Sequence, residues 1–481
     1  MKTAVIGFPR IGALRELKFS SEKYFRNEIT EEELLETGRT LRKTHWKIQK
    51  EAGSEYSACN DFSYYDGILD AAVMCGIIPK RYQELNLSEL DTYFAMARGY
   101  QGEAGDVKAL AMKKWFNTNY HYIVPEVEDD TVISFSGKKL LSEFEEAKEL
   151  GILVKPVVPG AYTLLKLCRY TGTKTAEDFV DDVILAYKEL LKLCDKNEVS
   201  WIQFDEPSLV FDMTEQDLAL FRKIYFEILP SAQSCQVLVQ TYFGDVRDVY
   251  QDLIQLPFAG VGLDFVEGKQ TKKLIEQYGF PKDKILFAGL VNGKNIWKNH
   301  YKETLQALQE LKEKGIHTVL STSCSLLHVP YTIEQEKELS DEYKKHFAFA
   351  KEKLSELRDL KVLAENENFL DSVLLKVNES LFLAGRDCVK EEVKNRLKQV
   401  KDEDYVRTPA RKERQKRQKE VLGLPIFPTT TIGSFPQTKD VKANRSAYRK
   451  GEKTKEEYEA FNRAKIAECV AWQEEIGLDV L

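Results

Sequence analysis

The feature of this sequence that most limits its fold is a regular alternation of short β-branched runs with long amphipathic stretches. Strand–helix alternation at this spacing is typical of βα units on a parallel sheet. Across residues 1–385 it favours a (β/α)8 TIM barrel over a doubly wound sheet, because eight or more strands are predicted. Nine strands are in fact predicted, so one of them is wrong or lies outside the barrel. The predicted strands are 3–9, 59–62, 122–127, 153–158, 200–204, 236–242, 261–266, 285–291 and 318–322, and the predicted helices are 31–51, 176–193, 214–228, 270–278, 301–314 and 333–357.

Composition excludes several classes of protein. The 70 basic and 77 acidic side chains among 481 residues leave a net charge of −7, which argues against a nucleic-acid partner. No apolar run approaches the ~18 residues that a membrane span needs, and the N-terminus has no secretory signal. The eight cysteines include no CxxC pair, so we expect reduced thiols. A cytoplasmic enzyme without a membrane partner is therefore predicted.

Residues 386–424 differ in character from the rest. They are dense in charge and nearly free of large apolar side chains, and acidic residues alternate with the basic ones. We interpret them as a charged helical linker rather than a nucleic-acid patch. The segment after them, LPIFPTTTIGSFP, predicts a new strand. Three regions are thus expected: a barrel over 1–385, the linker over 386–424, and the start of a second barrel over 425–481.

An internal repeat supports this division. The stretches 30–53 and 454–477 share their landmark residues without gaps, at a constant offset of 424. Upstream, VIGFP and TIGSFP repeat with an offset of 426. We read a tandem duplication whose second copy has only begun. The matching pairs are Thr30 and Thr454, Glu32 and Glu456, Glu33 and Glu457, Gln49 and Gln473, Glu51 and Glu475, and Gly53 and Gly477.

The last residues, 476–481, are unusually apolar for a terminus, and we predict a strand that enters a core. The expectation is that these 481 residues are a fragment of a longer protein, consisting of one complete barrel and the first strand and helix of another.

Two stretches could recognise a ligand. Arg15 and Lys18 follow the first strand and are three residues apart, so a helical turn would place both cations on one face, suited to a ligand with several carboxylates. They could equally be solvated charges at a helix start. Lys114 belongs to KKWFNTNYHY, which could wall a flat heteroaromatic ligand or be an aromatic core cluster.

Two further pairs could carry chemistry. Asp205 and Glu206 end a predicted strand, where they could bind a cation or act as a general base, or could instead cap and brace the structure. Cys324 and His328 follow another strand and could bind zinc or form a nucleophile. No further ligand of compatible placement is evident, which favours a buried thiol and a packing histidine.

Taken together, VIGFPRIGALRELK, KWFNTNYHYIVPE, WIQFDEP, SCSLLHVPY and LPIFPTTTIGSFPQT resemble the cobalamin-independent methionine synthases. The motifs occur in the family's order and span essentially the whole chain. The resemblance implies two face-to-face (β/α)8 barrels that arose by duplication. It also implies an activity without cobalamin: methyl transfer from 5-methyltetrahydropteroyltri-L-glutamate to L-homocysteine, giving methionine.

The resemblance assigns roles residue by residue. It implies folate binding by the Arg-Glu-Leu-Lys stretch and by the lysine before Trp-Phe, and homocysteine binding by an Ile-Gly-Ser. Cations at these positions suit the carboxylates of a polyglutamate tail. The implied folate-binding residues are Arg15, Glu16, Leu17, Lys18 and Lys114, and the implied homocysteine-binding residues are Ile432, Gly433 and Ser434.

The family's reaction needs zinc, because a thiol of pKa about 8.5 is largely protonated at neutral pH and Zn²⁺ deprotonates it. In the family the zinc ligands and the proton-donating histidine lie in the second barrel, beyond the position of Leu481. In the first barrel Tyr242 and Gly244 fall where the second has its His and Cys ligands, and Cys324 falls at the last Cys ligand. We therefore predict no metal and no catalytic residue on this chain.

Three interpretations remain open. The chain is the folate-tail-binding part of a methionine synthase and is inactive alone, or it is a non-catalytic folate-binding or scaffold module. A third is an independent enzyme that uses Asp205, Glu206, Cys324 and His328, although nothing in the sequence completes either pair.

Overall fold

The computed structural model describes residues 1–366, 368–383 and 390–481. The chain divides into two compact units, Met1–Gly385 and Arg386–Leu481. Each unit is described by itself. Among the described residues no helix is both long enough and apolar enough to cross a membrane.

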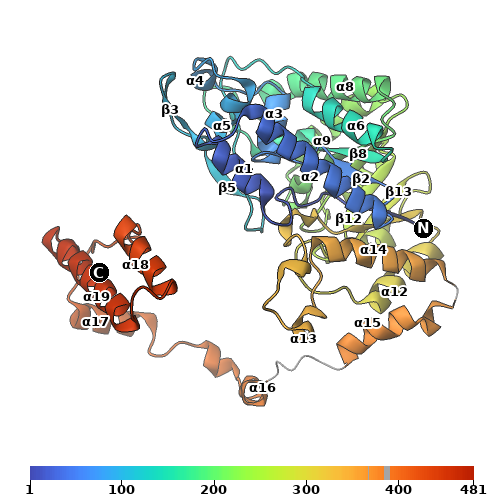
Figure 1. The fold of residues 1–481 in the computed structure, drawn as a ribbon. Helices are drawn as coiled ribbons and strands as arrows, with labels where there is room; N and C mark the ends of the chain where they lie inside the picture. The colour runs from blue at the N-terminus through green and yellow to red at the C-terminus, as the bar shows by residue number, and fades with distance from the viewer. Residues whose placement is uncertain (367, 384–389) are drawn as a thin grey trace. The chain divides into compact units, whose positions relative to one another are not determined.

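The first unit is built on eight parallel strands, as predicted. Their order is β1-β14-β13-β12-β11-β10-β8-β2, and every neighbouring pair is parallel. A parallel bridge between Ala4 and Tyr56 joins the two ends of this sheet and closes the barrel. Helices surround the strands on the outside (Figure 1). The strands are β1 (Lys2–Ala4), β2 (Ser57–Cys59), β8 (Val154–Pro159), β10 (Trp201–Asp205), β11 (Gln236–Gln240), β12 (Gly260–Asp264), β13 (Ile285–Val291) and β14 (Thr318–Thr322).

The ninth predicted strand, 122–127, lies outside the barrel. Part of it forms β6 (His121–Ile123), which pairs antiparallel with β5 (Met112–Lys114). A tight turn returns the chain, because the Trp115 amide donates to the Tyr120 carbonyl at 2.7 Å. The rest forms β7 (Glu126–Val127), which pairs with β9 (Arg169–Tyr170). A third small sheet joins β3 (Tyr100–Gly102) and β4 (Gly105–Val107).

Five of the six predicted helices form within a few residues of the expected bounds, and the sixth is wrong in its first half. Helix α14 starts at Ala350 rather than at 333, because the Glu352 carboxylate accepts from the amides of Ile333 and Phe349 at 3.2 and 3.1 Å and folds the intervening segment back. The helices of this unit are α1 (Glu16–Tyr24), α2 (Glu31–Glu51), α3 (Gly67–Met74), α4 (Lys80–Gln83), α5 (Glu89–Arg98), α6 (Lys138–Glu149), α7 (Ala161–Leu167), α8 (Val180–Lys196), α9 (Glu215–Ile228), α10 (Tyr250–Gln255), α11 (Thr271–Tyr278), α12 (Tyr301–Glu313), α13 (Asp341–Lys344), α14 (Ala350–Glu365) and α15 (Val373–Leu383).

The barrel interior is apolar at one end and polar at the other. Near the start of the strands, Trp201 and Phe287 meet edge to face with ring centroids 5.5 Å apart, and Tyr56 packs on both. Further along, Lys155 and Gln203 are fully buried, and the Lys155 ammonium donates to the Gln203 amide oxygen. The polar end is the carboxyl end of the strands, where barrels of this kind carry their binding sites.

The second unit consists of helices and irregular segments. Helices α18 and α19 pack against each other. The rings of Tyr448 and Tyr458 stack with centroids 4.7 Å apart, and Lys465 forms an ion pair with Asp440 at 3.1 Å. The segment predicted as a charged linker contains two exposed helices. The helices are α16 (Glu391–Lys398), α17 (Arg411–Leu422), α18 (Lys439–Arg449) and α19 (Lys455–Glu475).

The two strands predicted in this unit do not form. Residues 425–434 and 476–481 are irregular in the structure, and Ile432 is fully exposed. The two segments still meet, since the Thr429 carbonyl accepts from the Asp479 amide at 3.2 Å. In the first unit the Thr3 carbonyl accepts from the Glu55 amide in the same way, at 3.0 Å. Hydrogen bonds of Asp479 and Val480 that all meet at Thr429 do not make a strand, because a parallel strand needs neighbours along its length.

Candidate functional site

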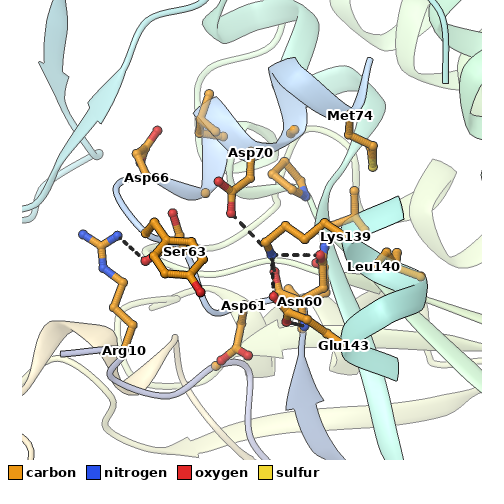
Figure 2. A pocket seen from close by; sticks show the side chains of 18 of the residues that line it. Arg10, Asn60, Asp61, Ser63, Asp66, Asp70, Met74, Lys139, Leu140 and Glu143 are labelled. Carbon is orange, nitrogen blue, oxygen red and sulfur yellow. Dashed lines mark hydrogen bonds and ion pairs between the residues drawn. The ribbon is translucent and has the colours of Figure 1, made fainter. Parts of the chain in front are cut away.

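A cavity of about 560 Å³ opens at the carboxyl ends of the barrel strands. This volume is in the range of small-molecule sites. Segments that directly end or follow β1, β2, β8, β10, β11 and β14 contribute to its lining. Figure 2 shows part of this lining, including Asn60 and Asp61 after β2. Residues of these segments that line it include Gly7, Asp61, Pro159, Asp205, Tyr242 and Ser325.

One wall of the cavity is a chain of ion pairs between helices. Lys139 of α6 pairs with Asp70 of α3 at 3.4 Å and with Glu143 at 3.1 Å, and it donates to both oxygens of Asn60 (Figure 2). On α2, Arg42 binds Glu146 through two bonds of 2.9 and 2.8 Å. Lys139 and Arg42 are thus already paired with carboxylates.

Asp205, the last residue of β10, lines the cavity. Its two oxygens accept from the Gln203 amide at 2.6 Å and from the Tyr242 hydroxyl at 3.0 Å. Burial raises the pKa of Asp205, while the nearby Lys155 ammonium opposes the rise. Burial also lowers the pKa of Lys155. Carboxyl and ammonium therefore share one desolvated network that reaches the cavity through Asp205 and Tyr242.

Glu206, its neighbour in sequence, faces away from this network and braces the fold. Its side chain is fully buried and accepts from the amides of Tyr162 and Thr163 at 3.0 and 2.8 Å, from the Thr163 hydroxyl at 2.6 Å and from the Tyr225 hydroxyl. Burial raises the pKa of Glu206 to about 7. Of the two carboxylates that could carry chemistry, only Asp205 lines the cavity.

Aromatic side chains form the opposite wall. The Tyr120 hydroxyl donates to Asp66 at 2.8 Å, and its ring lies 6.3 Å from the His328 ring. Arg10 lies over the Tyr120 ring at 5.8 Å and donates to the carbonyls of Ser63 and Tyr65. Burial lowers the pKa of His328 to about 4, so its ring is neutral at pH 7, and the charged side chains of this wall are Arg10 and Asp66.

The residues of this barrel do not fit a zinc ion. Within 1–366, 368–383 and 390–481 no group of three or more His, Cys, Asp or Glu side chains could hold a metal. Burial raises the pKa of Cys324, which keeps it a neutral thiol, and the Tyr242 hydroxyl is engaged with Asp205. The seven described cysteines are free thiols, as expected, and Cys388 lies outside the described residues.

Comparison with known protein families shows to which family this chain belongs. Residues 2–315 match the family model described as the N-terminal domain of cobalamin-independent synthases, and residues 427–481 match the catalytic domain of the same family. The chain belongs to the cobalamin-independent methionine synthase family. The boundary between the two matches agrees with the order of the repeat, in which the second copy begins near residue 425.

Two similar proteins from different bacteria have the same name as each other. A 5-methyltetrahydropteroyltriglutamate–homocysteine methyltransferase of Campylobacter jejuni subsp. doylei is 51% identical over 481 residues, covering 100% of this chain and 64% of that protein. One from Streptococcus suis is 52% identical over 484 residues, with 100% and 63% covered. This chain therefore spans about 64% of the length of these relatives.

A solved structure supports the fold alone. A protein of Listeria monocytogenes, described as a vitamin-B12 independent methionine synthase, aligns with a TM-score of 0.52 at 16% identity, covering 76% of this chain and 98% of that one. At this identity the likeness is evidence for the barrel and not for any residue's role.

Four of the five folate-binding residues expected in this synthase-family chain, Arg15, Glu16, Leu17 and Lys18, lie at the start of α1. Arg15 caps the helix in the left-handed conformation, with φ 64°, and its side chain is exposed. Lys18 is also exposed and pairs with Glu22 at 3.7 Å, Leu17 is buried, and Glu16 accepts from the Leu14 amide at 3.0 Å. Leu17 therefore anchors the helix, while the side chains of Arg15 and Lys18 are exposed.

Lys114 lies on the β5–β6 hairpin, exposed and paired in register with His121. Its neighbour Trp115 lines the cavity, whereas none of the five expected folate-binding residues is among the described residues that line it. The first unit therefore has two separate candidate binding surfaces. One is the cavity, and the other consists of the exposed cations Arg15, Lys18 and Lys114.

The expected homocysteine-binding residues lie in the second unit. Ile432, Gly433 and Ser434 are exposed in the irregular segment before α18, where the Thr431 hydroxyl donates to the Gly433 carbonyl at 3.3 Å.

Sequence reasoning missed most of the cavity. Asp61, Asp70 and Lys139 were not singled out, although Asp61 directly follows β2. A systematic search for carboxylates just after predicted strands could have found Asp61. Asp70 and Lys139 lie on helices, and only the packing of α3 against α6 brings them together.

Proposed function

We propose that this chain is the folate-tail-binding part of an enzyme that transfers a methyl group from 5-methyltetrahydropteroyltri-L-glutamate to L-homocysteine, giving methionine. The observation that carries the proposal is an alignment at 51% identity with a relative of that name, which covers all 481 residues of this chain and 64% of the relative. The match extends through the barrel and into the catalytic domain.

The placement of the cations supports the proposed role of the first unit. Arg15, Lys18 and Lys114 are exposed side chains. A triglutamate tail offers several carboxylates, and a group of lysine and arginine side chains at a surface can bind it by charge-assisted hydrogen bonds. Leu17 and Glu16 would hold the helix start in place, and Ile432, Gly433 and Ser434 would contact homocysteine.

Zinc enters this proposal only through the second barrel of the whole protein. There it would deprotonate the homocysteine thiol. Since the described residues of the first unit do not fit the metal, this unit would bind and orient the folate substrate.

The test compares two proteins: the 481-residue chain, and the product of the same gene read through any codons that follow codon 481. Methionine formation from homocysteine and the triglutamate substrate is measured with Zn²⁺ present. We expect activity from a longer product and none from the 481-residue chain, which should nevertheless bind the triglutamate. If the gene stops at codon 481 and the chain binds no folate, the proposal is wrong and a scaffold role replaces it.

A further inference from the structure

The cavity at the barrel mouth carries an excess of negative charge. Its lining contains eight carboxylate side chains and five lysine or arginine side chains, a surplus of three negative charges when all are ionised. A cavity with such a surplus attracts cations. The carboxylates are Glu31, Asp61, Asp66, Asp70, Glu89, Glu143, Glu146 and Asp205, and the cations are Arg10, Arg39, Arg42, Lys138 and Lys139.

Two carboxylates in the cavity have unused capacity. Asp61 accepts from the Phe8 amide at 2.8 Å, and among the described residues no ion pair includes it. The Asp70 Oδ2 atom is buried and accepts no hydrogen bond within the described residues, although the Lys139 ammonium lies 3.4 Å away and Glu143 and Arg10 are also close enough to act on its charge. A buried carboxylate oxygen without a donor is unfavourable, so a ligand that brings one would be bound.

The space beside Asp61 is kept open by a glycine. A Cβ on Gly7 would lie 2.6 Å from the Ser325 hydroxyl and 3.4 Å from Asp61 Oδ2. Figure 2 shows Arg10, Asp61 and Asp70 coming from different segments to surround this space. Burial raises the pKa of Asp61 to about 6, which still leaves it mostly ionised at neutral pH.

The remaining wall suits the apolar part of a ligand. Trp115 and Tyr120 line the cavity together with His328, which is neutral at pH 7. The Asp66 carboxylate fixes the Tyr120 ring through its hydroxyl. Flat aromatic faces stabilise both aromatic rings and organic cations.

From this arrangement we propose that the cavity binds a small organic cation, with an ammonium group at Asp61 and Asp70 and an apolar or aromatic body against Tyr120 and Trp115. The site is separate from the exposed cations Arg15, Lys18 and Lys114, and it does not depend on the proposed methyl transfer. An organic cation fits better than a metal ion, because no three metal-ligating side chains gather among the described residues, whereas an ammonium group needs only the two carboxylates.

The experiment titrates the 481-residue chain with benzylammonium chloride by calorimetry. Benzyl alcohol, a neutral molecule of nearly the same shape, is titrated in parallel. We expect one site with a Kd on the order of 1 mM or tighter for benzylammonium. Benzyl alcohol should bind about tenfold more weakly or less, because it leaves the carboxylates uncompensated.

The variant that locates the site is Asp61→Asn. It preserves the acceptor for the Phe8 amide and removes the charge, so benzylammonium affinity should fall about tenfold. Asp283→Asn, at an exposed turn, is the matched control and should bind as the unchanged chain does.

Three results would overturn the proposal. They are equal affinities for benzylammonium and benzyl alcohol, benzylammonium affinity unaffected by Asp61→Asn, and saturable binding of Mg²⁺ alone without binding of benzylammonium. The comparison of the two probes uses the unchanged chain, so it decides the question even if the variant does not fold.

Discussion

Thr30 and Thr454, 424 residues apart, cap two helices of 21 residues with the same pair of hydrogen bonds. In each, the threonine hydroxyl accepts from the amide three residues on at 3.2 Å, and the glutamate carboxylate at that position accepts from the threonine amide at 2.8 Å. Gly53 and Gly477, after the two helices, both adopt positive φ, 78° and 81°. The repeat seen in the sequence is therefore also a repeat of local structure.

This relationship predicts equal local roles for the two caps. Thr30→Ala should lower the free energy of unfolding of the first unit by about 1 kcal/mol, because one helix-terminal amide loses its acceptor. Denaturant unfolding followed by tryptophan fluorescence measures the change. Thr30→Ser keeps the hydroxyl and should restore most of the stability, and a loss as large as that of alanine would contradict the capping role.

Glu206 is predicted to be a structural residue. Glu206→Ala leaves the buried amides of Tyr162 and Thr163 and the Tyr225 hydroxyl without their acceptor, so it should cost about 3–5 kcal/mol of stability. The measurement is the urea midpoint of the chain. Glu227→Ala, at a half-exposed surface pair with Lys188, is the control and should change the stability by about 1 kcal/mol or less. Similar midpoints for the two variants would contradict the bracing role.

The burial of Glu356 is expected to make the stability of the chain depend on pH. Burial raises its pKa to about 7, above the ordinary value of 4.5, so the folded state holds the proton more tightly than the unfolded state. Its contribution to stability is therefore present below pH 4.5 and is lost as the pH rises through 7, by about 1–3 kcal/mol. Glu356→Gln still offers an oxygen to the Asn299 amide and should flatten the curve between pH 5 and 7. Parallel curves for the two proteins would show that the prediction is wrong.

Lys18 is predicted to bind the polyglutamate tail in the whole enzyme. Lys18→Ala should raise the KM for the triglutamate substrate more than for substrates with shorter tails, because only the longer tail reaches the cation. Its exposed pair with Glu22 is weak, so the stability should change by about 0.5 kcal/mol or less. Lys23→Ala, an exposed lysine later in the same helix, is the control. An equal rise in KM at every tail length would argue against the tail contact.

The zinc content of this chain is a further prediction. A tag-free, chelator-treated sample of the 481 residues should hold far less than one zinc per chain by elemental mass spectrometry, since the described residues offer no ligand set and Cys324 stays a protonated thiol. Equimolar zinc that survives the chelator would overturn this prediction.

Agreement between sequence and structure is best for elements whose sequence signals lie within the element itself, and poorer for elements that depend on distant partners. Helix α2 was predicted at its observed bounds because the Thr30 cap and the apolar periodicity lie within the helix itself. The segment LPIFPTTTIGSFP, residues 424–436, was predicted as a strand, but a strand also depends on partners. Without parallel neighbours in the described unit it stays irregular. Residues 121–123 likewise follow their partner: they pair with β5 in a hairpin and so lie outside the barrel.

The sequence by itself determined the alternation that makes a barrel, the repeat, and the family motifs around Arg15, Lys114 and Asp205. Each of these is written in residues close together along the chain. Only the tertiary structure decided that Asp205 faces a cavity while Glu206 braces the fold, and that Asp61, Asp70 and Lys139 meet at the barrel mouth. These outcomes depend on how strands and helices distant in sequence pack together, because burial and opposing charge, rather than residue type, set what a carboxylate can do.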